Sequence, residues 1–261
     1  MREYNMTISI RGAIAATLLA GSALAAAPAF ADEAPASPVT ITGNVSLVTD
    51  YRFRGISQSA GKMAVQGGIT ATHSSGFYVG TWSSSISEGS LPGYGSQELD
   101  LFAGWSGEVT PGVTLDAGLL YYVYPGGTDA FDTDFFEPWA SIKGTVGPAT
   151  IKVGANYAWK QSSLPNAFDG SKDDNLYVYG NVDIAIPSTP VTVSGHIGYT
   201  NGVLAPCYYC TGDKTGVDYS IGASATVFGP LSVGVSYIGV SGPSFNNYSD
   251  DSVVGTVTAS F

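Results

Sequence analysis

The final stretch of the chain, Asp250–Phe261, alternates between apolar and polar side chains up to the last residue. One parity carries Val253, Gly255, Val257, Ala259 and Phe261, and the other is mostly Ser and Thr. Because successive side chains of a β-strand point to opposite faces, this pattern predicts a strand with one apolar and one polar face. Whether the rest of the chain repeats the pattern decides the fold class.

Eleven further segments repeat the alternation, which makes twelve predicted strands of the length expected for tilted membrane-spanning strands. They are Ile41–Arg54, Met63–Ser74, Phe77–Ser87, Glu98–Gly107, Val113–Tyr124, Phe135–Val146, Thr150–Lys160, Asn175–Ile186, Val191–Thr200, Val217–Phe228 and Leu231–Val240. The connections alternate between short ones with Gly or Pro (75–76, 108–112, 147–149, 187–190 and 229–230) and longer polar ones (55–62, 88–97, 125–134, 161–174, 201–216 and 241–250). This alternation predicts an all-β fold, a 12-stranded antiparallel transmembrane outer-membrane β-barrel with short periplasmic turns and longer extracellular loops.

The N-terminal segment has the features of a secretory signal peptide. Arg2 and Arg11 precede the apolar run Ile14–Ala27, and Ala29-Phe30-Ala31 provides small residues for cleavage. We therefore expect a cleaved signal peptide at residues 1–31, a short lead at 32–38 and a barrel at 39–261. The mature chain would be exported through the inner membrane to the cell outer membrane.

Composition and charge narrow the class of protein further. The chain has 34 Gly and 16 Tyr but only 12% charged residues, and its net charge is −11. Losing Arg2, Arg11 and Glu3 with the signal peptide changes this value to −12, which excludes binding of nucleic acid through charge. Beyond the signal peptide, no apolar run reaches the eighteen or so residues of a spanning helix. A closed barrel is the other structure that can cross a membrane.

The opening strand region resembles the proteobacterial TorF family of porins. The resemblance is carried by Gly43–Ser59, with its run Tyr51-Arg52-Phe53-Arg54-Gly55-Ile56-Ser57, and by Val65–Gly68, Ser74–Trp82 and Glu98–Gly104. It is densest over residues 43–105 and continues as a general strand pattern to Phe261. The resemblance implies an outer-membrane location and a channel role, and it supplies neither a settled substrate nor catalytic residues.

Charged side chains within the predicted strands share one parity, opposite the apolar residues of their own strand. These residues, with His196, are Asp50, Arg52, Arg54, Glu98, Asp100, Asp116, Glu137, Lys143, Lys152, Lys160, Asp183 and Asp218. Turning a strand over would place a Lys or Arg in lipid at a cost of about 2–4 kcal/mol at the bilayer midplane. We therefore expect the polar parity to face the lumen.

Turn geometry predicts three clusters of these charges. A two-residue turn at Gly147-Pro148 would put Lys143 opposite Lys152, and like charges in this position repel each other. Two predicted clusters follow: an Asp116–Lys143–Lys152–Asp183 belt near the short turns, and a diagonal Glu137–Lys160 pair near the outer rim. At the barrel seam, where the first strand would pair with the last strand and its final residue Phe261, we expect the charges at the end of the first strand to meet those at the beginning of the last. These seam charges are Asp50, Arg52, Arg54, Asp250 and Asp251.

Two roles stay open for the lumen charges. They can stiffen the wall by satisfying one another, or they can set a field that orients ionic solutes. Twelve strands lie between barrels of eight, which side chains fill, and barrels of sixteen or more, which enclose an open channel. The resulting hypothesis is a narrow channel for passive passage of small polar or ionic solutes, without a catalytic step.

Two alternatives accompany this hypothesis. The first is an outer-membrane hydrolase that uses His196 with Ser194 on the same face, since a nucleophilic hydrolase needs such a pair within hydrogen-bond reach. The second is a plugged barrel that acts as a receptor or adhesin through its loops. The carboxylate pair Glu98 and Asp100 does not provide the contrasting environments that acid–base hydrolysis of glycosides requires.

The remaining expectations concern the cysteines and the partners. Cys207 and Cys210 form a single CxxC in an outer loop of an exported chain, which favours a disulfide. A zinc site would need a second pair of ligands, so no metal or cofactor is expected. Expected partners are outer-membrane lipid and lipopolysaccharide, the barrel-assembly machinery and small polar solutes. Acidic outer loops could hold divalent cations, and a homo-oligomer remains open.

Overall fold

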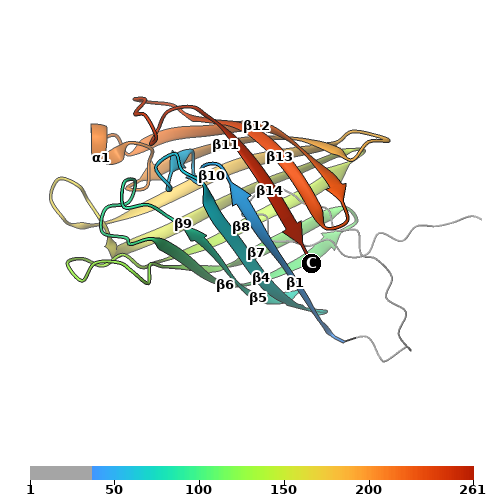
Figure 1. The fold of residues 1–261 in the computed structure, drawn as a ribbon. Coiled ribbons are helices and arrows are strands. Elements are labelled where there is room, and N and C mark those ends of the chain that lie inside the picture. Colours follow the sequence, from blue (N-terminus) through green and yellow to red (C-terminus); the bar gives the residue numbers. More distant parts are fainter. Residues whose placement is uncertain (1–36) are drawn as a thin grey trace, which may run out of the picture.

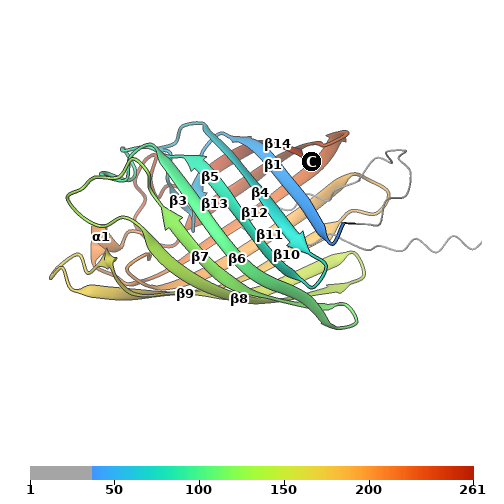
Figure 2. The same cartoon turned by 90° about the horizontal axis from the view of Figure 1, so that it is seen from below.

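The computed structural model describes residues 37–261, and these residues form a closed barrel of twelve antiparallel strands (Figure 1). The predicted fold class is confirmed. The predicted signal peptide lies outside the described residues. The wall strands are β1 (Val39–Val48), β4 (Ala64–His73), β5 (Phe77–Ser85), β6 (Gln97–Thr110), β7 (Val113–Val123), β8 (Phe135–Val146), β9 (Ala149–Pro165), β10 (Lys172–Ala185), β11 (Val191–Gly202), β12 (Thr215–Phe228), β13 (Leu231–Val240) and β14 (Ser252–Ser260). The strands are inclined to the barrel axis (Figure 2).

The first and last strands close the sheet. β1 pairs with β14 from Asn44↔Ser260 to Val48↔Thr256, and its other edge pairs with β4. Gly43 extends the seam, because its N–H donates to the carbonyl oxygen of Phe261 over 2.8 Å and its carbonyl oxygen accepts from the N–H of Phe261 over 2.9 Å. A Cβ at Gly43 would lie 2.7 Å from the Phe261 ring, so the close approach requires glycine. The seam leaves no edge whose polar groups would face lipid.

The connections fall into a short-turn end and a long-loop end, as the sequence predicts. The five hairpin turns at the short-turn end include Gly147-Pro148, where Gly147 has a φ of 59°. The start of β1 and the C-terminus both lie at this end, opposite α1 (Figure 1). The strand predicted over Thr150–Lys160 continues to Pro165 as β9, with register shifts against β10 at Asp173. The predicted loop 161–174 is therefore shorter.

The two faces of the wall differ as the alternation predicts. In β9, Ile151 and Val153 are each 50% exposed on the outside, whereas Lys152 between them points inward and is half-buried. Glu98, Asp100, Glu137 and Asp218 are all buried within the barrel. The wall is thus apolar outside and polar inside.

The predicted first strand, Ile41–Arg54, is wrong in its second half. β1 ends at Val48, and residues 49–63, here called the inward loop, leave the wall and turn into the barrel. Two short strands, β2 (Arg52–Phe53) and β3 (Ile56–Ser57), pair within this loop. Arg54 and Gly55 connect them with φ values of 47° and 80°, the left-handed conformations of a two-residue hairpin turn. The turn reverses the chain inside the lumen, whereas the predicted strand would have continued along the wall to Arg54.

Other loops also contribute to the barrel interior. The connection from β11 to β12 contains the short helix α1 (Tyr208–Thr211) and buries Val203, Ala205 and Tyr208 in one apolar cluster with wall residues such as Leu120. A second cluster joins Tyr51 of the inward loop to Ile86 of the next loop. Within residues 37–261, no helix is long and apolar enough to cross a membrane. The two apolar clusters show that loop side chains fill part of the space that the wall encloses.

Introducing a charged side chain on the outer face tests which face of the wall contacts lipid. We expect Val153→Lys to lower the free energy of unfolding by about 2–4 kcal/mol, because it places an ammonium group in hydrocarbon. The matched control is Ser224→Lys on the inward parity of β12, which should change the free energy much less. Guanidinium-induced unfolding in lipid vesicles, followed by tryptophan fluorescence, measures both. Equal losses in the two variants would contradict the assignment of faces.

Candidate functional site: a lumen ring joined by Arg54

The inward loop is held in place by its own polar side chains. Asp50 accepts hydrogen bonds from Arg52 Nε and Ser57 Oγ, each over 2.6 Å, and from Ser59 Oγ over 2.9 Å. Arg52 also forms an ion pair with Asp250 across the seam, over 3.3 Å. The Asp50–Arg52 pair is buried and electrically balanced, so it fixes the base of the loop without adding net charge.

Arg54 lies at the tip of the inward loop and reaches the opposite wall. Its Nη2 atom donates to both carboxylate oxygens of Glu137 in β8, over 2.7 and 2.8 Å. Its guanidinium carbon lies 4.2 Å from the ring centre of Tyr177 in β10 and 4.7 Å from that of Phe53. Glu137 is 0% exposed and Arg54 is 9% exposed, so this ion pair is largely removed from solvent. A charge-assisted hydrogen bond of this kind is stronger than a neutral one.

Seven consecutive strands, β6 to β12, each supply one polar side chain to the region around Arg54. These seven residues, here called the lumen ring, are Asp100, Tyr122, Glu137, Asn156, Tyr177, His196 and Asp218. Tyr122 Oη and Asn156 Nδ2 donate to Glu137 over 3.2 and 3.1 Å. Asp100 lies opposite Tyr122 in the β6–β7 register. Arg54 contacts two members of the ring, through hydrogen bonds to Glu137 and by lying over the ring of Tyr177.

His196 belongs to the second half of the lumen ring. Its Nε2 lies 2.8 Å from Asp218 Oδ1 and 2.9 Å from Tyr177 Oη, and its Nδ1 lies 2.5 Å from Asn181 Oδ1. His196 lies directly opposite Asn181 in the β10–β11 register. Ser194 Oγ instead donates to Asp183, over 2.6 Å. The Ser–His pair that a hydrolase would need is therefore not formed.

Three buried polar atoms at this level make no hydrogen bond within residues 37–261. They are Arg54 Nη1, Asp100 Oδ1 and Asp218 Oδ2. Desolvating a charged group without a partner is costly, so such atoms in a lumen are positions where water or a solute can bind. Glu98, two residues before Asp100 on the same face, accepts a hydrogen bond from Tyr51 Oη over 3.1 Å. Both predicted carboxylates of β6 thus lie at the inward loop.

The predicted belt lies nearer the short turns. Lys143 and Lys152 face each other in the β8–β9 register, as the Gly147-Pro148 turn predicts. Asp116 accepts hydrogen bonds from Tyr78 Oη and Trp139 Nε1, and Asp183 accepts one from Ser194. Each acid of the belt accepts at least one hydrogen bond from a neutral donor, and the function of the belt as a constriction stays a prediction.

Two predicted charge clusters need correction. Arg54 does not join the seam charges, because the inward loop carries it across to Glu137; Asp251 instead accepts a hydrogen bond from Tyr237 on the exposed face. Glu137 consequently pairs with Arg54 rather than with Lys160, which is exposed where β9 departs from regular register with β10. Of the seam charges, Asp50, Arg52 and Asp250 do meet.

The two cysteines are free thiols, which contradicts the predicted disulfide. Cys207 is buried at the start of α1 and its Sγ lies 3.6 Å from the carbonyl oxygen of Pro243, while Cys210 is exposed. Partial burial, with the neighbouring Cys207 thiol, raises the pKa of Cys210 to about 11. A thiol with this pKa is a poor nucleophile at neutral pH, because only the thiolate reacts.

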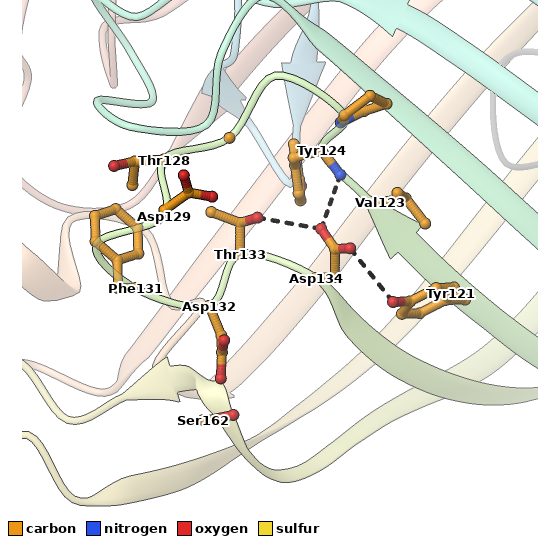
Figure 3. A pocket seen from close by; sticks show the side chains of 12 residues that line it. Tyr121, Val123, Tyr124, Thr128, Asp129, Phe131, Asp132, Thr133, Asp134 and Ser162 are labelled. Atoms are coloured by element: carbon orange, nitrogen blue, oxygen red, sulfur yellow. Dashed lines mark hydrogen bonds between the residues drawn. The ribbon is translucent and has the colours of Figure 1, made fainter.

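A pocket of about 650 Å³ opens among the outer loops, between the β7–β8 connection and β9 (Figure 3). Asp134 is fixed in its wall, since it accepts hydrogen bonds from the Tyr124 N–H, Thr133 and Tyr121. Asp129 and Asp132 also line it, and its lining contains no basic side chain. Within residues 37–261, no group of three or more His, Cys, Asp or Glu side chains is arranged to hold a metal ion. The pocket itself is therefore acidic.

Comparison with known proteins assigns the chain to a family. Residues 32–261 match the family described as bacterial protein of unknown function (Gcw_chp). The chain belongs to this family. The match does not test the resemblance to the TorF family by name, and no curated protein matches the chain significantly.

Solved structures similar to this family member are outer-membrane barrels. The NanC porin has 12% sequence identity and a TM-score of 0.57, with 85% of this chain and 99% of that chain covered. The KdgM porin, in complex with disordered oligogalacturonate, has 9% identity and a TM-score of 0.53 over 85% and 97% of the two chains. An outer-membrane channel from Pseudomonas putida F1 has 10% identity and a TM-score of 0.51 over 88% and 99%. At these identities the likeness shows a shared fold.

Sequence reasoning identified the charged members of the lumen ring but missed how Arg54 reaches them. The overlooked signal is Gly55, which with Arg54 forms a two-residue turn between Arg52-Phe53 and Ile56-Ser57. A second signal is the buried aromatic Tyr51, which the alternation would place in lipid. Both signals mark a chain that turns inward.

The Arg54–Glu137 pair gives a stability prediction. Glu137→Gln should destabilise the barrel by about 3–5 kcal/mol, because it leaves a buried guanidinium without its counter-charge. The double variant Arg54→Met/Glu137→Gln should recover a large part of this loss. A double-mutant cycle with Arg54→Met, measured as free energies of unfolding in vesicles, gives the coupling. Additive effects would contradict a direct interaction.

Proposed function

We propose that this protein is a porin-like channel of the outer membrane that lets small polar or ionic solutes pass through a narrow lumen. The observation that carries the proposal is the lumen ring. Seven strands each present a polar side chain to the region around Arg54, which contacts the ring at Glu137 and Tyr177. A barrel whose interior only stabilised the wall could be filled with apolar residues at lower cost in desolvation. The shared fold with two porins and a channel adds support.

The lumen ring and the inward loop would set the limiting cross-section. Arg54 is stacked between Phe53 and Tyr177 and bonded to Glu137, so it occupies space that a solute would need. Solutes that replace hydration water with hydrogen bonds to the ring would pass more readily than apolar ones. The proposal includes no catalytic step.

A plugged barrel is the second candidate, and a specific observation favours it. Val203, Ala205 and Tyr208 from the β11–β12 connection are buried in a cluster with wall residues. If this cluster closes the lumen permanently, the long loops would act as a receptor or adhesin surface. Passage of solute separates the two functions.

Conductance of the folded protein tests the proposal. Purified barrel in a planar bilayer should give stepwise ion conductance, and proteoliposomes should swell in small sugars or amino acids. Heat-unfolded protein, added at the same concentration, is the control. Current no higher than that of bare lipid, together with no swelling, would contradict the channel and favour the plugged barrel.

Removing the arginine contact should widen the passage. We expect Arg54→Ala/Glu137→Gln to raise single-channel conductance about twofold or more, because a bulky charged side chain leaves the lumen and no buried charge is stranded. The matched control is Asp173→Asn/Lys214→Ala, which removes an ion pair from the outer loops. The control should conduct like the unaltered protein. Unchanged conductance in Arg54→Ala/Glu137→Gln would show that the cross-section that limits conductance lies elsewhere in the lumen.

A further inference from the structure

We infer that the lumen ring selects for small cations and binds them at Asp100 and Asp218; this inference rests on the proposed channel function and names its solute class. Four carboxylates lie at this level, on Glu98, Asp100, Glu137 and Asp218, and all are buried. Arg54 supplies the opposing charge. With all four carboxylates ionised, the formal charge of these five groups is −3.

These four carboxylates differ in how many hydrogen-bond partners they have. Glu137 is fully engaged, because Arg54, Tyr122 and Asn156 donate to it. Glu98 accepts from Tyr51 through both of its oxygens. Asp218 Oδ1 contacts Tyr177 and His196, whereas its Oδ2 has no partner. The positive charge of Arg54 is therefore directed at Glu137 and leaves the other three carboxylates without an arginine or lysine ion pair within residues 37–261.

The two unpartnered oxygens point to a cationic ligand. Asp100 and Asp218 are 4% and 3% exposed, and Asp100 Oδ1 and Asp218 Oδ2 make no hydrogen bond within residues 37–261. A buried acceptor without a donor is costly, and a permeating cation lowers that cost while it is bound. Hard alkali ions and compact ammonium ions match carboxylate oxygen. A ring of acidic side chains is also the usual basis of cation selectivity.

The approach to the lumen ring carries charge of the same sign. Asp129, Asp132 and Asp134 line the pocket among the outer loops. Potentials from such acidic surfaces raise the local concentration of cations and oppose anions at moderate salt. At the other end, the predicted belt contains two lysines, Lys143 and Lys152, and two aspartates, Asp116 and Asp183, so its formal charges balance.

Reversal potentials test this inference. With a tenfold KCl gradient across a planar bilayer, the unaltered channel should favour K⁺ over Cl⁻ by about fivefold or more. Asp100→Asn and Asp218→Asn, which preserve shape, should each lower this permeability ratio by about two- to threefold. Asp169→Asn is the matched control, because it removes an exposed loop carboxylate and should leave the ratio unchanged. Repeating the measurement with methylammonium chloride tests compact organic cations.

The outcomes separate the inference from the proposed function. A channel that conducts but favours Cl⁻, or shows no preference, overturns the cation inference and leaves the channel intact. A cation preference that neither Asp100→Asn nor Asp218→Asn lowers overturns the assignment to these two residues. A folded protein that does not conduct overturns both. A ratio that falls in the two lumen variants and is retained in Asp169→Asn supports the inference.

Discussion

The absence of water in the hydrocarbon layer is the constraint on which the structure depends. Every backbone N–H and C=O of the wall must find a partner in a neighbouring strand, so the sheet has to close. The pairing of β1 with β14, extended by Gly43 and Phe261, provides this closure. Once the sheet is closed, side chains of one parity face lipid and those of the other face the lumen. The polar residues of each strand are then gathered in one enclosed space.

Gathering charges in an enclosed space creates a problem that the inward loop partly solves. Four wall carboxylates, those of Glu98, Asp100, Glu137 and Asp218, lie at a similar level. Within residues 37–261, the cation that forms an ion pair with Glu137 is Arg54, which comes from the loop and not from a wall strand. An arginine is suited to this task, since its planar guanidinium donates to both oxygens of Glu137 and stacks on Tyr177. The left-handed conformation of Arg54 carries a cost that these contacts offset.

How much of the structure can be predicted depends on how far along the chain each sequence pattern reaches. Alternation has a period of two residues and is set by the faces of the wall, so it locates the twelve strands and puts Asp100, Glu137 and Asp218 in the lumen. The register of Lys143 with Lys152 follows from a turn of two residues. Arg54 and Glu137 are separated by 83 positions along the chain, and no local pattern encodes that distance. The same limit explains the wrong Glu137–Lys160 pair, because an exposed bulge displaced Lys160.

The placement of Arg54 on a loop, rather than on the wall, has a consequence for how the lumen can change. Wall charges are fixed by hydrogen bonds along both edges of their strand, so they move only with the barrel. The inward loop is joined to the wall at Val48 and Ala64, and within the lumen it is held by side-chain contacts such as Tyr51–Glu98 and Arg54–Glu137. Those contacts can be exchanged for contacts to a solute without breaking the sheet. In the proposed channel, a loop cation paired with a wall carboxylate would therefore let the lumen ring respond to a passing solute while the wall stays closed against lipid.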